Sequence, residues 1–450
     1  MEHRRRPLRA DMDGDRCSLE ELGPLSHLTI LGISGMENVS SPSFARKARL
    51  DEKVHLKYLF LECTNKLGDD GQLIKEDEGI SENLQQQIEE VFDELCPPSS
   101  LEMLGIVGYF GQQLPRWMMS TVDMPLRSLR ILKMDNLACC TQLPNGLCQL
   151  QCLEDLQIVN APVIKRVGSE FLRHIHHSHN HSQAGALFPR LSRLYFSGLM
   201  EWVEWEWEEQ VSAMPILEKL KLEKCKLRHV PPGLAFHAKD LKELGIFYVK
   251  HLSSLENFTS VVYLNVLGNT DLETIINLPT LQKLVISKCP KLKVLEGMPA
   301  LQRLQLEDYE MQAVPRYLKD VNPRHLLLDC SLSLISCIAA AKSGPEWDKF
   351  SHIQQVDAYA DDEGISRKWY VLYIRHPFGF ETNISRTAIV QGRRERKSYA
   401  YLTTCPIEDE WTLGQRAQED EGQLRLWFRG WRGGVECACY YDPSMPIPDC

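Results

Sequence analysis

Hydrophobic residues recur along this chain in a short, fixed pattern. The stretch from Leu281 to Leu295 carries apolar side chains at 281, 284 and 286, a small Cys289, and then leucines at 292 and 295. The alternation over 284–286 predicts a short strand with every second side chain directed inward. The later leucines predict a returning segment on the same core. One such unit cannot bury its own apolar face, so it must stack against similar units.

The same pattern recurs over most of the chain. Its starts at Leu241, Val261, Leu281 and Leu301 are spaced by 20 residues. A fixed spacing of this kind is the sequence signature of a repeat protein, in which each start opens one coil of a solenoid. Earlier starts in the same phase lie at Leu25, Leu56, Leu101, Leu129, Leu153, Leu191 and Leu217.

The pattern L-x-x-L-x-L-x-x-N/C-x-x-L is that of a leucine-rich repeat. It predicts an α/β solenoid, a curved horseshoe with short parallel strands on its concave face and irregular or helical segments on its convex face. We place the solenoid at residues 21–340, with loop insertions near 64–80 and 168–187, after a polar, disordered segment at 1–20. Residues 341–450 lose the period and are predicted to form a C-terminal extension.

Two stretches predict elements of another kind. The helical spacing over 84–95 predicts a helix with one apolar stripe, ended by Pro97 and Pro98, and packing on the solenoid is favoured over a free partner-binding role. Alternation over Lys368–Ile374 predicts a strand of the extension. The stripe of the helix consists of Leu84, Ile88, Val91, Phe92 and Leu95.

Three tryptophans stand between glutamates in the segment 201–209. Trp202, Trp205 and Trp207 could form an edge that binds a protein. Packing of some of these rings over the flank of the solenoid is the favoured interpretation.

Charge and cysteine content narrow the setting. The formal charge of −10 disfavours general binding to nucleic acid or to an anionic membrane. We find neither a secretory signal nor an apolar run that could cross a bilayer. The 15 scattered cysteines are therefore expected to be reduced thiols in the cytoplasm. The basic run 393–397 is compatible with a nuclear address, although an exposed loop is favoured.

Recognisable catalytic and cofactor-binding motifs are missing. The sequence has no phosphate-binding loop of the G-x-x-x-x-G-K-[ST] type, no G-x-S-x-G and no H-E-x-x-H. We therefore expect no enzymatic activity, no cofactor and no metal. Five histidines, which could hold Zn²⁺ or Ni²⁺, are interpreted as part of a solvated loop; they are His174, His176, His177, His179 and His181.

Several stretches resemble the leucine-rich-repeat region of plant intracellular disease-resistance proteins of the coiled-coil, cereal type. The most specific are Val91–Pro98 with Gly108–Gly111 and Trp117, and Trp369–Phe378 in the tail. Phe188–Leu191, followed by Trp202 and Trp205, also matches. The family's coiled coil and nucleotide-binding (NB-ARC) switch domain have no counterpart here, so the resemblance implies a fragment or a truncated paralogue.

The resemblance implies a non-enzymatic protein-recognition module of plant innate immunity. Such a module senses pathogen effectors or restrains the NB-ARC switch domain, so its partners are proteins rather than nucleic acid or membrane. The alternative is a leucine-rich-repeat substrate adaptor for ubiquitin ligation. That role needs an F-box-like helical segment, which residues 1–24 are too short and too polar to supply.

Binding is expected on the concave face, where the x residues of L-x-x-L-x-L-x point outward. Aromatic residues stand there among basic ones, and both kinds are frequent energetic centres of interfaces. Solvation of these strand residues without a partner remains the alternative. The candidate partner-binding residues are Arg193, Tyr195, Lys219, Lys221, Phe247, Tyr263, Lys283 and Arg303.

Overall fold

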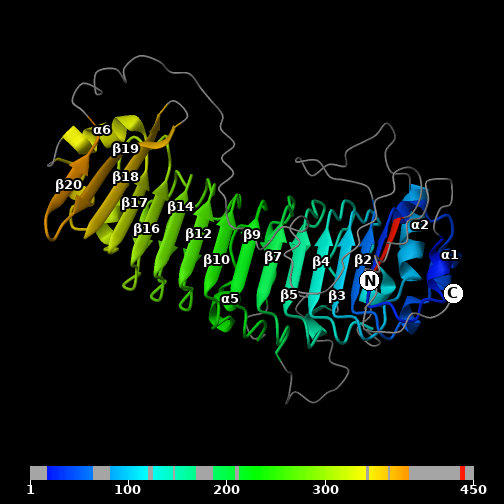
Figure 1. Cartoon of the computed structure of the whole chain (residues 1–450). Coiled ribbons are helices and arrows are strands. Elements are labelled where there is room, and N and C mark those ends of the chain that lie inside the picture. Colours follow the sequence, from blue (N-terminus) through cyan, green and yellow to red (C-terminus); the bar gives the residue numbers. More distant parts are fainter. Residues whose placement is uncertain are drawn as a thin grey trace, which may run out of the picture.

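The computed structural model describes residues 18–63, 82–119, 125–144, 147–168, 186–207, 212–340, 344–362 and 365–384, and the backbone of 436–440. Within these ranges the successive repeats contribute their strands to one 16-stranded sheet. Figure 1 shows the strands side by side in one long, curved row, from the blue first repeats to the orange β20. The row is open and does not close into a barrel.

Most strands of this sheet are short and parallel. They are β1 (Ile30–Ser34), β2 (Tyr58–Glu62), β3 (Met103–Val107), β4 (Ile131–Asp135), β5 (Asp155–Val159), β7 (Arg193–Ser197), β9 (Lys219–Glu223), β10 (Glu243–Phe247), β12 (Tyr263–Leu267), β14 (Lys283–Ser287), β16 (Arg303–Glu307), β17 (His325–Asp329) and β18 (Gln355–Asp362). Antiparallel strands form the two edges of the sheet. At one edge β19 (Ile365–Ile374) and β20 (Gly379–Thr382) follow β18, and at the other β21 (Glu436–Tyr440) pairs with β1.

The strands pair in register. Leu244, Leu264, Leu284 and Leu304 are direct partners on consecutive strands, and all four are buried. Each inward leucine therefore packs on the equivalent leucine of the next coil, which is how a repeat that lacks a core of its own becomes stable. The predicted curved leucine-rich-repeat solenoid is confirmed.

The returning segments differ along the chain. Small parallel sheets form from β6 (Arg166–Val167) with β8 (Glu204–Trp205), and from β11 (Ser254–Glu256), β13 (Thr274–Ile276) and β15 (Val294–Glu296). The described helices are α1 (Pro42–Lys47), α2 (Glu82–Asp93), α3 (Arg116–Met119), α5 (Pro232–His237) and α6 (Leu332–Ala340). Single 3₁₀ turns are η1 (Leu19–Leu22), η2 (Met36–Asn38), η3 (Leu50–Glu52), η4 (Leu147–Gln149), η5 (Arg316–Asp320) and η6 (Trp347–Lys349).

A left-handed residue directly follows the strand in most repeats. Its amide donates to the carbonyl of the last residue of the next strand, as from Gly198 to Glu223 at 3.0 Å and from Gly268 to Ser287 at 2.9 Å. Glycine reaches this conformation without steric cost. Other repeats place Asn136, Asn160, Lys224, Tyr248 and Lys288 there, with φ from 49° to 56°.

The Asn/Cys slot of the repeat has a clear physical purpose. Asn269 is fully buried; its Nδ2 donates to the Ile246 carbonyl at 2.7 Å, and its Oδ1 accepts from the Val249 amide at 2.9 Å. The side chain thus satisfies two backbone groups where the chain leaves the strand of the preceding repeat. In an early repeat Tyr109 occupies the slot instead, and its buried hydroxyl donates to the Gln113 carbonyl at 2.5 Å.

The first repeat corrects one prediction. A start at Leu25 would direct Leu28 and Ile30 into the strand core, but Ile30 lies in the outward row and Leu25 is 40% exposed. The inward residues are Leu31 and Ile33, so the pattern begins at Leu28, which is buried. Two overlapping leucine phases exist in this segment, and only packing against β2 selects one.

The predicted helix and the tryptophan packing are confirmed. Helix α2 buries Ile88, Val91 and Phe92, and ends at Asp93, ahead of the two prolines. Trp202 and Trp205 are buried with Phe196, at centroid distances of 5.2 and 5.8 Å from its ring.

The ladder continues beyond residue 340. Strand β18 pairs in parallel with β17, after α6, and the alternating stretch predicted in the tail is the antiparallel β19. Because the parallel sheet continues through β18, the predicted boundary between solenoid and C-terminal extension at residue 341 stays a prediction. No helix within the described ranges has both the length and the apolar character needed to cross a bilayer. Residues 1–17, most of both predicted insertions, the five clustered histidines and the basic run 393–397 lie outside the described residues.

Candidate protein-binding face

The outward side of the long sheet is its concave face. Each five-residue strand directs its first, third and fifth residues to this face, and the in-register pairing aligns them in three rows across the sheet. We call these the first, second and third rows. The first row reads Ile30, Tyr58, Met103, Ile131, Asp155, Arg193, Lys219, Glu243, Tyr263, Lys283, Arg303, His325 and Gln355.

All eight candidate residues lie on this face. Arg193, Lys219, Tyr263, Lys283 and Arg303 belong to the first row. Tyr195 and Lys221 belong to the second row and Phe247 to the third. The structure therefore brings them together on one surface, from β7 to β16, but their contacts divide them into two groups.

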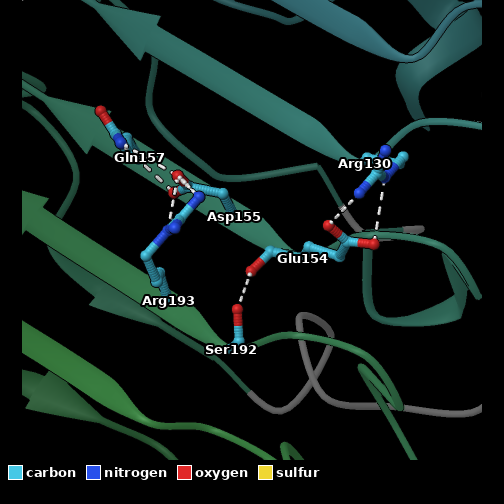
Figure 2. Close-up of polar contacts among 6 residues, drawn as sticks. All are labelled: Arg130, Glu154, Asp155, Gln157, Ser192 and Arg193. Carbon is cyan, nitrogen blue, oxygen red and sulfur yellow. Dashed lines mark hydrogen bonds and ion pairs between the residues drawn. The ribbon is translucent and has the colours of Figure 1, made fainter.

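The Arg193 side chain forms an ion pair with Asp155 on the adjacent strand. Its Nε and Nη2 both lie 3.0 Å from Oδ2 of Asp155, a carboxylate that is only 4% exposed and also accepts from Gln157 at 3.2 Å (Figure 2). This buried carboxylate needs the guanidinium as a partner, because an unpaired buried charge is costly. Arg193 is thus a structural residue of the face.

A second paired group surrounds Lys221. Its Nζ lies 3.0 Å from Glu223 Oε2, 4.6 Å from the Tyr195 ring centroid and 5.1 Å from that of Phe247. The Tyr195 hydroxyl donates to the same Glu223 at 2.9 Å, and burial raises the pKa of that hydroxyl. Four side chains therefore satisfy one another on β7, β9 and β10.

Lys219 is paired as well. Its Nζ lies 3.0 Å from Glu243 Oε2, on the adjacent strand of the first row. Of the five cationic candidates, three are thus neutralised within the protein.

The remaining candidates, Tyr263, Lys283 and Arg303, are not engaged by carboxylates of the described residues. Lys283 Nζ lies 4.7 Å from the Tyr263 ring centroid, and Arg303 is exposed on the next strand. In the part of the chain that the structure describes, neither cation forms an ion pair. The third row contributes Glu307, whose pKa is raised by burial.

Sequence reasoning missed the N-terminal part of the same face. On β1 to β4 the outward positions are mostly apolar and partly exposed: Ile30, Tyr58, Phe60, Met103, Val107 and Ile131. The x positions of the same repeat pattern carry this signal, but the candidate set was drawn only from later repeats. Two charges beside this apolar area, those of Arg130 and Glu154, form a two-pronged contact at 3.0 and 2.8 Å (Figure 2).

An ion pair between an exposed arginine and a buried aspartate at the C-terminal end was also missed. Arg367 on β19 donates to both oxygens of Asp329 on β17, at 2.8 and 2.7 Å, and stacks 4.9 Å from the Tyr359 ring centroid. Asp329 is 1% exposed. The pair fastens the antiparallel end of the sheet to the last repeats.

Side chains that could bind a metal are not clustered in the described ranges. There, no cluster of three or more His, Cys, Asp or Glu side chains could hold a metal ion. The described cysteines are free thiols, including Cys225 and Cys289 in the repeat slot.

Comparison with known proteins agrees with this geometry. The family model described as R13L1/DRL21 LRRs matches residues 19–161. Disease resistance protein RGA4 of Solanum bulbocastanum is 28% identical over 257 residues, 55% of this chain and 23% of that protein. The solenoid is a leucine-rich-repeat region of the kind found in plant disease-resistance proteins.

Two further relatives carry similar names. Disease resistance protein At3g14460 of Arabidopsis thaliana is 31% identical over 220 residues, 48% of this chain and 14% of that protein. Disease resistance protein RGA1 of Solanum bulbocastanum is 26% identical over 247 residues, 54% of this chain and 22% of that protein. The leucine-rich-repeat chain thus spans less than a quarter of the length of each of these relatives.

Proposed function

We propose that this chain is a recognition module of plant disease resistance that binds a protein through its concave face and carries out no reaction. The partner is a pathogen effector, or an NB-ARC switch domain that the module restrains. In the second case, binding shifts the switch between two states, because the module prefers one of them.

One observation carries the proposal: the in-register parallel ladder displays aromatic and cationic side chains on one continuous face. Tyr195 and Tyr263 supply half-buried aromatic area, beside Phe247, which is 8% exposed. Lys283 and Arg303 supply charge. Aromatic residues and arginine are enriched at the centres of protein interfaces. The names of the relatives support disease resistance as the setting.

A steric test separates the concave face from the rest of the solenoid. Asn265 lies in the second row of β12, between neighbouring strands, and is half-buried. Asn265→Trp should block a partner that spans this face. Lys239→Trp, at an exposed position after α5, serves as the matched control.

Binding of the full chain to a purified NB-ARC region of a family member and to a panel of secreted pathogen proteins would be measured by calorimetry. We expect at least one partner whose affinity falls by about tenfold or more with Asn265→Trp and stays unchanged with Lys239→Trp. Equal affinity of both variants for every partner found would contradict a concave binding face.

A further inference from the structure

Two cations of the first row stand apart from the other candidate cations in their surroundings. Lys283 and Arg303 are direct register partners on β14 and β16, so their backbones lie about 4.8 Å apart. Tyr263 precedes them on β12, and its ring supports the Lys283 ammonium at 4.7 Å. The three side chains form a continuous open triad along the first row.

The charged side chains on the strands to either side of this triad are already paired with each other. Toward the N-terminus, Glu243 is engaged by Lys219 at 3.0 Å. Toward the C-terminus, His325 Nε2 lies 2.8 Å from Asp357 Oδ2, so neither group is available to the triad. The positions directly before Lys283 and Arg303 are Gln282 and Gln302, which carry no charge.

Glu307 is an acidic side chain on the same strand as Arg303; burial raises its pKa, and the charge of Lys283 acts in the opposite direction. Glu307 lies in the third row and is half-buried, and it accepts a hydrogen bond from Gln305. It forms no ion pair with Lys283 or Arg303 among the described contacts. Two positive charges on adjacent strands therefore face the concave side together, in a chain whose formal net charge is −10.

We infer that the triad of Tyr263, Lys283 and Arg303 is the docking point for an acidic segment of the partner protein, with two carboxylates about one strand spacing apart. The inference rests on the proposed function and names the chemistry of its partner. Guanidinium and ammonium groups bind carboxylates by charge-assisted hydrogen bonds, and the tyrosine adds a hydroxyl donor and ring area. The acidic balance of the whole chain opposes a nucleic acid as the occupant.

Lys219 offers a matched control. It lies in the same row, on the same face, and carries the same charge, but it is already paired with Glu243. Lys219→Gln therefore removes one positive charge from this row without removing an open cation, whereas the Lys283→Gln/Arg303→Gln double variant removes two open cations. The earlier expectation that Lys219 and Lys221 belong to the binding patch would assign them an equal effect.

The test uses the full chain and a phage-displayed library of random dodecapeptides. Selected peptides are synthesised, and their affinities are measured by fluorescence anisotropy for the parent chain, the Lys283→Gln/Arg303→Gln double variant, Lys219→Gln and Asn265→Trp. Thermal unfolding of each variant checks that the fold is intact, which we expect because Arg303 is exposed and Lys283 makes no ion pair.

We expect selected peptides to be rich in Asp and Glu and to bind the double variant about tenfold or more weakly. Lys219→Gln should stay within about twofold, and added salt should weaken binding because the charges are exposed. Neutral peptides that are blocked by Asn265→Trp but indifferent to the double variant would overturn this inference and leave the proposed function standing. Peptides indifferent to both would count against the concave face itself. Equal competition by an unrelated RNA would also overturn the acidic-protein assignment.

Discussion

The first four strands and the strands from β9 to β16 share one sheet but present different outward surfaces. Inward, both regions place leucine or a similar residue in the same rows, as Leu104 and Leu284 do. Outward, the first region shows Met103 and Ile131, and the second shows Lys283 and Arg303. Folding fixes the inner rows, because every coil must bury them, and leaves the outer rows free to carry recognition.

The segments that connect one strand of the long sheet to the next also differ between the two regions. The repeats that begin at 241, 261 and 281 are 20 residues long and close with the small sheet of β11, β13 and β15. The early repeats are longer and insert helix α2; one of them fills its slot with Tyr109 and buries Trp117 of helix α3 beside it. The slots of these regular repeats hold the small or medium-sized Val249, Asn269 and Cys289, whereas the early repeats bury large side chains such as Tyr109 and Trp117.

The largest effect is expected from Asn269, the polar slot residue of the regular repeat that begins at 261. Asn269→Leu leaves the Val249 amide and the Ile246 carbonyl buried without partners. We expect the free energy of unfolding to fall by about 2–4 kcal/mol, measured by urea denaturation. Tyr109→Phe in the early slot removes only one hydrogen bond and keeps the ring, so about 1 kcal/mol is expected. Equal losses would refute the contrast between the two kinds of slot.

A smaller effect is expected from the fitted side chains of the early repeats. The Trp117 indole donates to the Phe92 carbonyl at the end of α2, at 2.8 Å. Trp117→Phe removes this bond and some ring area, and should lower the free energy of unfolding by about 1–2 kcal/mol. Hydrogen exchange should locate the loosening in α2 and leave β12 and β14 protected. Uniform loosening of all repeats would show that the early region is not held separately.

Buried thiols test whether the two regions share one interior. Burial raises the pKa of Cys148, Cys225 and Cys330 to about 12, and these three thiols belong to well-separated repeats of the solenoid. At pH 8 alkylation mapped by mass spectrometry should label the exposed Cys337 rapidly and these three only on unfolding.

The same thiols predict a direction for alkaline stability. They stay protonated in the folded state while the unfolded chain ionises from a pKa of about 9, so the folded state loses stability as the pH rises from about 9 toward 12. Replacing Cys225 by alanine should reduce this slope, measured by thermal unfolding across that range. An unchanged slope for variants of all three thiols would exclude them as its source.

The smallest effect concerns the left-handed turn. Lys288 is exposed and has φ of 51°, where the neighbouring repeat has Gly268. Lys288→Gly relieves the strain of a side chain in this region and should raise the free energy of unfolding by up to about 1 kcal/mol. Gly198→Ala is the opposite change, because its Cβ would lie 2.6 Å from Asn160 Oδ1 at φ of 69°. Destabilisation by both variants would mean that Lys288 makes contacts worth more than its strain.

The sequence by itself determined the inner architecture. Burial at period 2 is a local requirement, so the leucine pattern predicted the strands and, beyond the first repeat, their inward rows. The helical period predicted α2. Packing of Trp202 and Trp205 followed from the same reasoning, since large apolar rings beside a repeat core are most stable when buried.

Only the tertiary structure decided which outward residues are open. Whether Lys219 meets Glu243, Arg193 meets Asp155, or Arg367 reaches Asp329 depends on the register and side-chain conformation of residues 24 to 38 positions apart. The phase of the first repeat and the continuation through β18 were likewise settled by neighbouring strands. Local pattern specifies what each coil must bury; contact between coils specifies which charges remain to meet a partner.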